Sequence, residues 1–122
     1  MKVSPHVTIY KFPIGAITSV MHRITGASIS VFFIGGGLSH LYGYNPISMY
    51  DSLNNYQKPV VDFTILFPSV YHTFGGLRHF IWDKYPQYLT NTKVNKSSYT
   101  LLGISFVSSG ILSYSNVLRN II

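Results

Sequence analysis

Ser19, His22, Arg23 and Gly26 place polar groups in an apolar stretch of the sequence, at spacings of i, i+3, i+4 and i+7. Residues at these spacings share one face of an α-helix. An arginine at a bilayer centre costs about 2.5–3.5 kcal/mol on insertion scales, so an ionisable residue in an apolar span is a functional candidate. A hydroxyl, an imidazole and a guanidinium on one face indicate a site for an anionic or carbonyl-bearing ligand. The alternative is that the charged groups only reach the lipid headgroups.

His72 and His79 lie seven residues apart, two helical turns, and so share a face of a second apolar stretch, with Arg78 beside His79. Two interpretations of His72 stay open: an interhelical hydrogen bond, or ligation of a metal by a neutral imidazole. Gly75 and Gly76 follow His72 by three and four residues and leave room for a flat macrocycle against the helix. They favour ligation, although glycine also promotes close helix packing. Arg78 and His79 are near enough to the end of the stretch to reach headgroups.

Depth along the helices predicts different roles for these residues. At a rise of about 1.5 Å per residue, one membrane edge would hold a cluster of four polar residues, His22, Arg23, Arg78 and His79. His72 would lie ~10 Å deeper. The other deep histidine, His40, lies near the opposite end of the first stretch, so its depth does not match that of His72. A haem with two axial ligands would therefore need its second ligand from another subunit.

Three apolar blocks must position these residues, and polar, turn-rich loops separate them. Each block is near the ~20 residues with which a helix crosses ~30 Å of hydrocarbon. The sequence predicts an all-α membrane protein with three transmembrane helices that form part of a heteromeric helix bundle, since small residues in the first and third blocks allow close packing. The expected parts are an extended interfacial segment at 1–17, a membrane domain at 18–118 with spans at about 18–42, 59–82 and 99–118, and a short tail at 119–122.

Composition excludes several classes of protein. Hydrophobic residues make up 47% of the chain and charged residues only 10%, against about 25% charged in a typical soluble domain. The chain has no cysteine, which excludes Cys-ligated zinc, iron–sulfur clusters and disulfides within it. Its net charge is +6, but the basic residues are scattered, so no nucleic-acid partner is expected. The amino-terminal segment and the loop at 83–98 carry most of the lysines, which places the amino terminus in the matrix or cytoplasm.

These residues fall within longer motifs of a known family. The run SPHVTIY at residues 4–10 is similar to that family's amino-terminal segment, and SVMHRITG at 19–26 resembles its S-x-x-H-R-x-[ST]-G signature. Residues 67–83, FPSVYHTFGGLRHFIWD, resemble its second signature, H-x-x-x-G-[apolar]-R-H-x-x-[aromatic]-D. Over about residues 4–83 the chain resembles the cytochrome b large membrane-anchor subunit family of succinate dehydrogenase, respiratory complex II.

The resemblance implies a function and a set of site residues. It implies that His72 is an axial ligand of haem b, held between this chain and a small membrane-anchor subunit that supplies the second ligand. It also implies that Ser19 and Arg23 line a ubiquinone pocket next to the iron–sulfur subunit. Three further residues would lie near the haem propionates, namely His22, Arg78 and His79. Electrons from succinate would pass from the flavoprotein subunit through the iron–sulfur subunit to ubiquinone, and this chain would hold no succinate-oxidising site.

The resemblance implies location in the mitochondrial inner membrane, or in the plasma membrane if the source is bacterial. The direction of electron flow stays open, since a fumarate reductase uses the same kind of anchor. Two other functions remain as alternatives: a haem-free structural anchor, and a small transporter or channel subunit. Ser19, Arg23 and His72 argue against the first. Against the second, the charged groups gather at one edge, and the far half of the membrane offers little beyond His40 and Asp62.

Overall fold

The computed structural model describes residue 9 and residues 11–121, with side chains up to residue 116. In these ranges the regular elements are all helical. Three are long: α2 (Ile14–Leu41), α4 (Gln57–Lys84) and α5 (Asn91–Ile121). A short helix, α3 (Pro46–Asp51), joins the first two, and a single 3₁₀ turn, η1 (Pro86–Tyr88), joins the last two. The prediction of an all-α fold is confirmed.

Local sequence explains where the helices begin and end. Pro13 stands directly before α2, and its carbonyl accepts hydrogen bonds from the first turn. The turn after α2 uses Gly43 at a φ of +83°, a conformation that favours glycine. Asn45 caps α3 by accepting a hydrogen bond from the Ile47 amide, and Pro46 occupies the first helical position. Asn54 likewise accepts from backbone amides at the start of α4.

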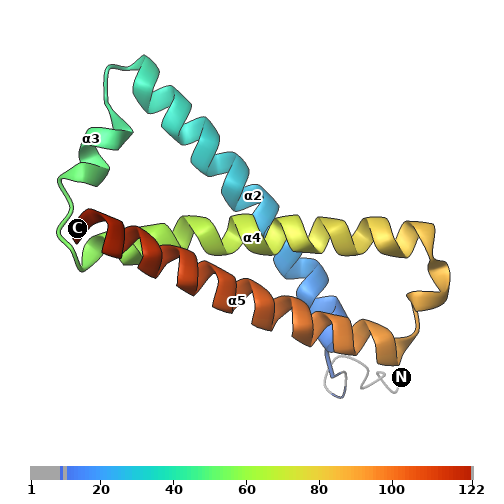
Figure 1. The fold of residues 1–122 in the computed structure, drawn as a ribbon. Helices are drawn as coiled ribbons and strands as arrows, with labels where there is room; N and C mark the ends of the chain where they lie inside the picture. Colours follow the sequence, from blue (N-terminus) through green and yellow to red (C-terminus); the bar gives the residue numbers. More distant parts are fainter. Residues whose placement is uncertain (1–8, 10, 122) are drawn as a thin grey trace.

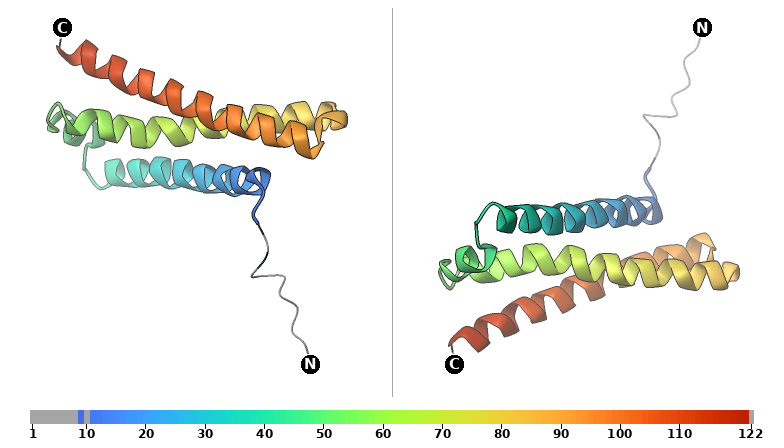
Figure 2. Two further views of the ribbon diagram at one scale, coloured as in Figure 1. Left: turned by 90° about the horizontal axis from the view of Figure 1, so that it is seen from below. Right: turned by 90° about the horizontal axis from the view of Figure 1, so that it is seen from above.

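The long helices form layers with α4 in the middle. Figure 2 shows α2 on one side of α4 and α5 on the other. In Figure 1, α5 follows α4 as its antiparallel neighbour, whereas α2 crosses α4 obliquely and its second half diverges toward α3. The start of α2, the end of α4 and the start of α5 therefore meet at one end of the molecule.

The contacts between the helices are made mainly by small and polar residues. Among the described residues, only Tyr71 and Leu101 are buried hydrophobic side chains, whereas the buried polar set on α5 is a stripe of four serines, Ser98, Ser105, Ser109 and Ser113. Small residues let helices approach closely without a large apolar core. Ser105, Ser109 and Ser113 of the third block thus form a packing face, as the sequence predicted, and Ser98 extends it.

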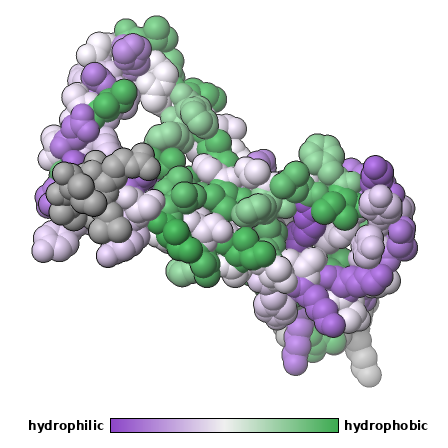
Figure 3. Space-filling model, viewed as in Figure 1, coloured by the Kyte–Doolittle hydropathy of each residue, from purple (hydrophilic) through white to green (hydrophobic). Residues whose placement is uncertain are grey.

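Most large apolar side chains point outward. Figure 3 shows an apolar surface over the middle of the molecule and hydrophilic residues gathered toward its two ends. The exposed set includes Val31, Phe33, Phe80, Val107 and Ile111. An apolar exterior of this extent indicates contact with lipid or with other subunits.

The helices are longer than the predicted spans. At about 1.5 Å per residue, the 28 residues of α2 and of α4 exceed the thickness of the hydrocarbon core. By length and composition, α2 is apolar enough to cross a membrane. Among the described helices it alone meets that test, since α4 carries charged and imidazole groups and α5 is rich in serine. The spans proposed for α4 and α5 stay predictions.

The described helices extend into two of the predicted flanking segments. The extended segment expected at 1–17 is helical at Ile9 and over 14–17, because α2 starts directly after Pro13. The rest of that prediction falls largely on residues 1–8 and 10, which lie outside the described residues. The tail expected at 119–122 is helical to Ile121, because no glycine or proline follows the last apolar block to end α5.

Candidate functional site

Two histidines meet where α2 crosses α4. The rings of His22 and His72 stack with centroids 4.1 Å apart and planes 3° from parallel. The Nδ1 atom of His72 lies 3.0 Å from the backbone carbonyl oxygen of His22, a hydrogen-bonding distance. This bond is made when Nδ1 carries the proton, and in that tautomer Nε2 keeps its lone pair.

Two glycines make the crossing possible. A Cβ atom on Gly26 of α2 would lie 2.7 Å from Cε1 of His72. A Cβ atom on Gly75 of α4 would contact Nδ1 of His22. Each helix therefore presents a glycine to the imidazole of the other. Gly76, by contrast, has nothing within 4 Å of a built Cβ, so it leaves free space beside α4.

The structure corrects the predicted depths. His72 was expected ~10 Å deeper than His22, but their rings are in contact. The expectation assumed parallel helix axes, whereas α2 crosses α4 obliquely (Figure 1). His22 also lies 5.2 Å from His79 between ring centroids. The three imidazoles form a row along α4 with His22 in the middle, so His22 and His79 do come together as predicted.

The side chain of Arg78 contacts Ser98 of α5 and Trp82. Its Nη1 atom donates to the Ser98 hydroxyl of α5 at 3.1 Å, and its guanidinium carbon lies 4.5 Å from the Trp82 ring centroid. The Ser98 hydroxyl lies 3.0 Å from that of Thr18, and the Tyr71 hydroxyl donates to the Thr18 carbonyl. This junction links all three long helices. The sequence analysis did not identify Thr18, Tyr71 or Ser98 as members of this junction. Ser98 precedes Ser105 by seven residues, and this spacing keeps it on the same helix face as the serine stripe.

Ser19 and Arg23 lie on α2 beside His22. Ser19 is half-buried and Arg23 is exposed. Neither side chain makes a hydrogen bond or ion pair with the part of the chain that the structure describes. They share a helical face, as their spacing predicted, and the place of Arg23 in the predicted cluster stays a prediction. Because no described residue pairs with them, both side chains can bind a ligand or a partner subunit.

Several buried polar atoms have no partner within this chain. Among the described residues they are His22 Nδ1, Arg78 Nε, Ser105 Oγ and Ser109 Oγ. A buried polar atom without a hydrogen bond costs about 1–3 kcal/mol. Two of the four, His22 Nδ1 and Arg78 Nε, belong to residues singled out from the sequence.

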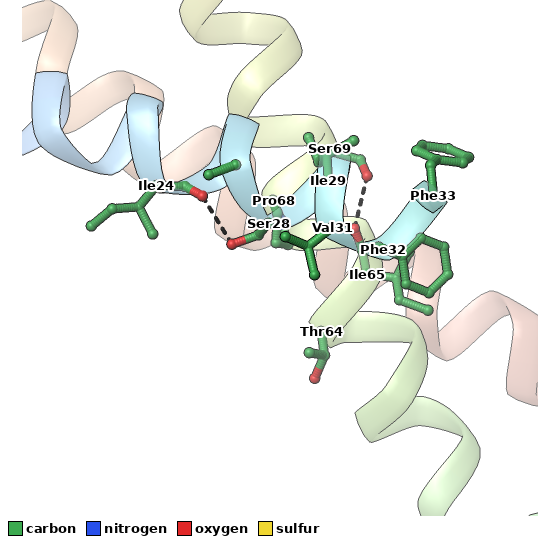
Figure 4. Close-up of a pocket in the computed structure, with 11 residues that line it drawn as sticks. Ile24, Ser28, Ile29, Val31, Phe32, Phe33, Thr64, Ile65, Pro68 and Ser69 are labelled. Carbon is green, nitrogen blue, oxygen red and sulfur yellow. Dashed lines mark hydrogen bonds between the residues drawn. The ribbon is translucent and has the colours of Figure 1, made fainter. Parts of the chain in front are cut away.

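An apolar groove of about 580 Å³ opens between α2 and α4, next to the histidines toward the diverging ends. Figure 4 shows residues from both helices around it, including Ile24, Phe32 and Ile65. Its hydroxyls bond to their own helices: Ser28 donates to the Ile24 carbonyl at 2.9 Å, and Ser69 donates to that of Ile65 at 2.8 Å (Figure 4). The groove therefore suits an apolar occupant, such as a neighbouring helix or a lipid tail.

The opposite end of the molecule has its own polar contact. The Tyr50 hydroxyl of α3 donates to Asp62 of α4 at 2.8 Å, and the Asn116 amide of α5 lies 3.5 Å from the other carboxylate oxygen. Burial and the bond to Asp62 raise the pKa of the Tyr50 phenol. Asp62 thus ties α3 and α5 to the start of α4. His40, near the end of α2, is exposed and does not approach His72.

Comparison with known proteins decides the family. The sequence pattern of the succinate dehydrogenase/fumarate reductase transmembrane subunit family matches residues 1–112. The chain belongs to this family. The two signatures read from the sequence lie within the matched residues, as do His22, His72 and both glycines of the helix crossing.

Individual relatives agree with this assignment. The succinate dehydrogenase cytochrome b560 subunit of Reclinomonas americana is 36% identical, over 86% of this chain and 78% of its own length. The mitochondrial subunits of the same name from Dictyostelium discoideum and Sus scrofa are 34% and 33% identical, over 91% and 88% of this chain. The chain spans 60% of the Dictyostelium relative and 66% of the Sus scrofa one. A transmembrane family with mitochondrial relatives supports location in the mitochondrial inner membrane.

Proposed function

We propose that this chain is a membrane-anchor subunit of respiratory complex II that binds haem b together with a small anchor subunit. One observation carries the proposal: His72 directs Nδ1 to the His22 carbonyl and leaves Nε2 without a hydrogen bond to the described residues. Metal-bound histidines usually have this arrangement, in which the second ring nitrogen is held by a carbonyl or carboxylate. The residues present therefore fit a haem iron.

In this proposal His72 would hold the haem iron, and His22 holds the His72 ring in orientation. The stacked ring and the carbonyl of His22 fix the tautomer and the plane of His72. His22 and His79 would lie toward the propionates, since the His22 ring stacks on that of His72 and lies 5.2 Å from that of His79 between centroids. When bound, haem b supplies reversible one-electron chemistry. The second ligand comes from the small anchor subunit, because His40 does not approach His72.

Arg78 fits the propionate region less well. Its guanidinium binds Ser98 on α5 and stacks on Trp82. These contacts favour a role in joining α4 to α5. Its positive charge nevertheless adds to the field at this end of the bundle, where the carboxylates of a haem would be stabilised.

We propose that Ser19 and Arg23 form this chain's part of a ubiquinone site. Reduction of ubiquinone to ubiquinol takes up two electrons and two protons, and negative charge develops on the carbonyl oxygens before protonation. A hydroxyl and a guanidinium can donate hydrogen bonds to those oxygens, and donors placed in advance stabilise the developing charge. Two observations support this assignment: both side chains are unpaired within the described chain, and they share a face of α2.

The electron donors lie in other subunits. The chain has no cysteine, so it holds no Cys-ligated iron–sulfur cluster. The proposal assigns the clusters to an iron–sulfur subunit beside Ser19 and Arg23, and the oxidation of succinate to a flavoprotein subunit. The amino terminus would face the matrix, since the lysines concentrate on that side.

Activity measurements on variants of the assembled complex test this function. Ser19→Ala and Arg23→Gln should lower succinate–ubiquinone reductase activity, while reduction of a soluble dye by succinate, which needs no membrane site, stays unchanged. Ser28→Ala is the matched control, since its hydroxyl bonds only to its own helix. A loss of one hydrogen-bond donor at such a site costs about 10²–10³ in rate. Unchanged ubiquinone reduction in both variants would contradict the quinone site. If the complex also contained no haem, the remaining function of this chain would be that of a structural anchor.

A further inference from the structure

A second groove lies on the other side of α4 from the histidines. It runs between the end of α4 and the start of α5 and measures about 1020 Å³. Apolar side chains form its inner part, among them Phe74, Leu77 and Ile104. Toward the loop that joins the helices, its lining changes to basic and aromatic residues. The groove is therefore amphipathic along its length.

The basic residues that line the groove have no acidic counterpart in its lining. Lys93, Lys96 and Arg78 line the groove, and no carboxylate does. Lys93 and Lys96 are exposed, and Lys93 approaches a backbone carbonyl at 3.4 Å. Arg78 is only 8% exposed, and its Nε has no partner within the described residues. Three positive groups without an anion indicate a negatively charged occupant.

The aromatic residues of the lining indicate the depth at which the groove lies in the membrane. Trp82, Tyr85 and Tyr88 surround its basic end. Trp and Tyr gather where hydrocarbon meets headgroups. The basic end thus lies at headgroup level, and the apolar part, around Leu77 and Ile104, extends into the hydrocarbon. An occupant with a charged head and an apolar tail, aligned with the bilayer, matches both ends.

We propose that this groove binds an acidic glycerophospholipid of the leaflet that faces the amino terminus. The phosphate would lie between Lys93 and Lys96, with Arg78 below it, and one acyl chain would follow Leu77 and Ile104. Basic pockets between transmembrane helices on the matrix side have this character. The groove contains none of His72, Ser19 and Arg23, so lipid binding can be measured separately from haem and quinone binding; Arg78 is the one residue that lines the groove and was also predicted to lie near the haem.

Photolabelling of the intact complex tests the proposal. The complex is placed in nanodiscs of phosphatidylcholine that contain a trace of phosphatidylglycerol with a diazirine on its acyl chain. We expect labels in the segments around Leu77 and Ile104. Lys93→Gln/Lys96→Gln should weaken binding of this probe about 30-fold, the fold-change that corresponds to about 1 kcal/mol per lysine. Both lysines are exposed, so their replacement leaves folding intact.

Two controls make the result decisive. Lys84→Gln removes an exposed lysine at the same end that does not line the groove, and it should leave labelling unchanged. A phosphatidylcholine probe with the same diazirine should label the wild type weakly and respond little to the double variant. Equal labelling by both probes, or equal labelling of the double variant and the wild type, would overturn the proposal. So would an unlabelled groove in the wild type, which would mean that a protein subunit covers it.

Discussion

Contact between an imidazole and a glycine decides how closely α2 and α4 approach. His22 lies against Gly75, and His72 lies against Gly26. Each pair joins one helix to the other, so the four residues act as one unit at the crossing. The orientation of His72 depends on this unit, because the carbonyl that its Nδ1 meets belongs to His22.

Gly75→Ala should disturb this unit. The new methyl group would contact Nδ1 of His22, and overpacking of this kind costs about 1–3 kcal/mol. We expect a lower midpoint of thermal inactivation and a lower haem content per complex. Gly103→Ala on α5 is the matched control, since a Cβ there meets nothing within 4 Å and the residue is remote from the histidines. If both variants behaved alike, the close approach at Gly75 would not matter for assembly.

Tyr50→Phe removes the hydroxyl that donates to Asp62. Loss of one such hydrogen bond costs about 1 kcal/mol. Burial raises the pKa of Tyr50, and the bond to Asp62 adds to the shift. The folded state therefore favours the neutral phenol, and this contribution is present below the ordinary pKa of 10.0 and lost as the pH rises through the higher folded value.

Thermal unfolding between pH 9 and pH 11 measures this effect. The wild type should lose stability at the alkaline end, whereas Tyr50→Phe should start lower and lose less. Parallel pH curves for the two proteins would show that the phenol does not titrate differently in the folded state.

The serine stripe of α5 sets the distance between α4 and α5. Ser105 and Ser109 are 0% exposed, and their hydroxyls have no partner among the described residues. Ser109→Leu should force the helices apart and destabilise the complex by about 1–3 kcal/mol. Ser109→Ala should be neutral or slightly stabilising, because it removes an unsatisfied hydroxyl. Melting curves of the purified complex would compare the two, and a tolerated leucine would contradict the packing role of the stripe.

Much of this arrangement could be predicted from the sequence. The apolar blocks indicate the helices, and the spacing of Ser19, His22 and Arg23 indicates their common face. The contact of His22 with His72 could not be derived, because it depends on the angle at which α2 crosses α4. That angle follows from glycine positions on both helices together. The Thr18–Ser98 contact was missed for a related reason: each is an ordinary small residue until the three helices are assembled.

At the scale of the whole molecule, the exterior is more apolar than the interior. Tyr71 and Leu101 are the buried hydrophobic residues of the described chain, whereas Val31, Phe33 and Phe80 are exposed. Lipid and partner subunits must cover this surface. The chain is therefore built to be completed by others.

The topology of the molecule makes its orientation testable. The end of α4 and the start of α5 lie at one end, and α3 lies at the other (Figure 1). Because the chain has no cysteine, any maleimide label found on this chain after the subunits are separated reports the introduced cysteine. In inner-membrane vesicles, Lys84→Cys should react with a membrane-impermeant maleimide from the matrix side, and Tyr44→Cys only from the opposite side. The reverse pattern would overturn the predicted orientation, and labelling of both from one side would contradict the spans.

A reduced-minus-oxidised absorption spectrum of the purified native complex tests whether His72 ligates haem b. We expect a b-type band in the wild type, its loss in His72→Ala, and its retention in His40→Ala, since His40 is remote from the helix crossing. Subunit composition, measured on the same samples, shows that the complex is still assembled. A band that survives in an assembled His72→Ala complex would contradict the assignment of His72 as the haem ligand.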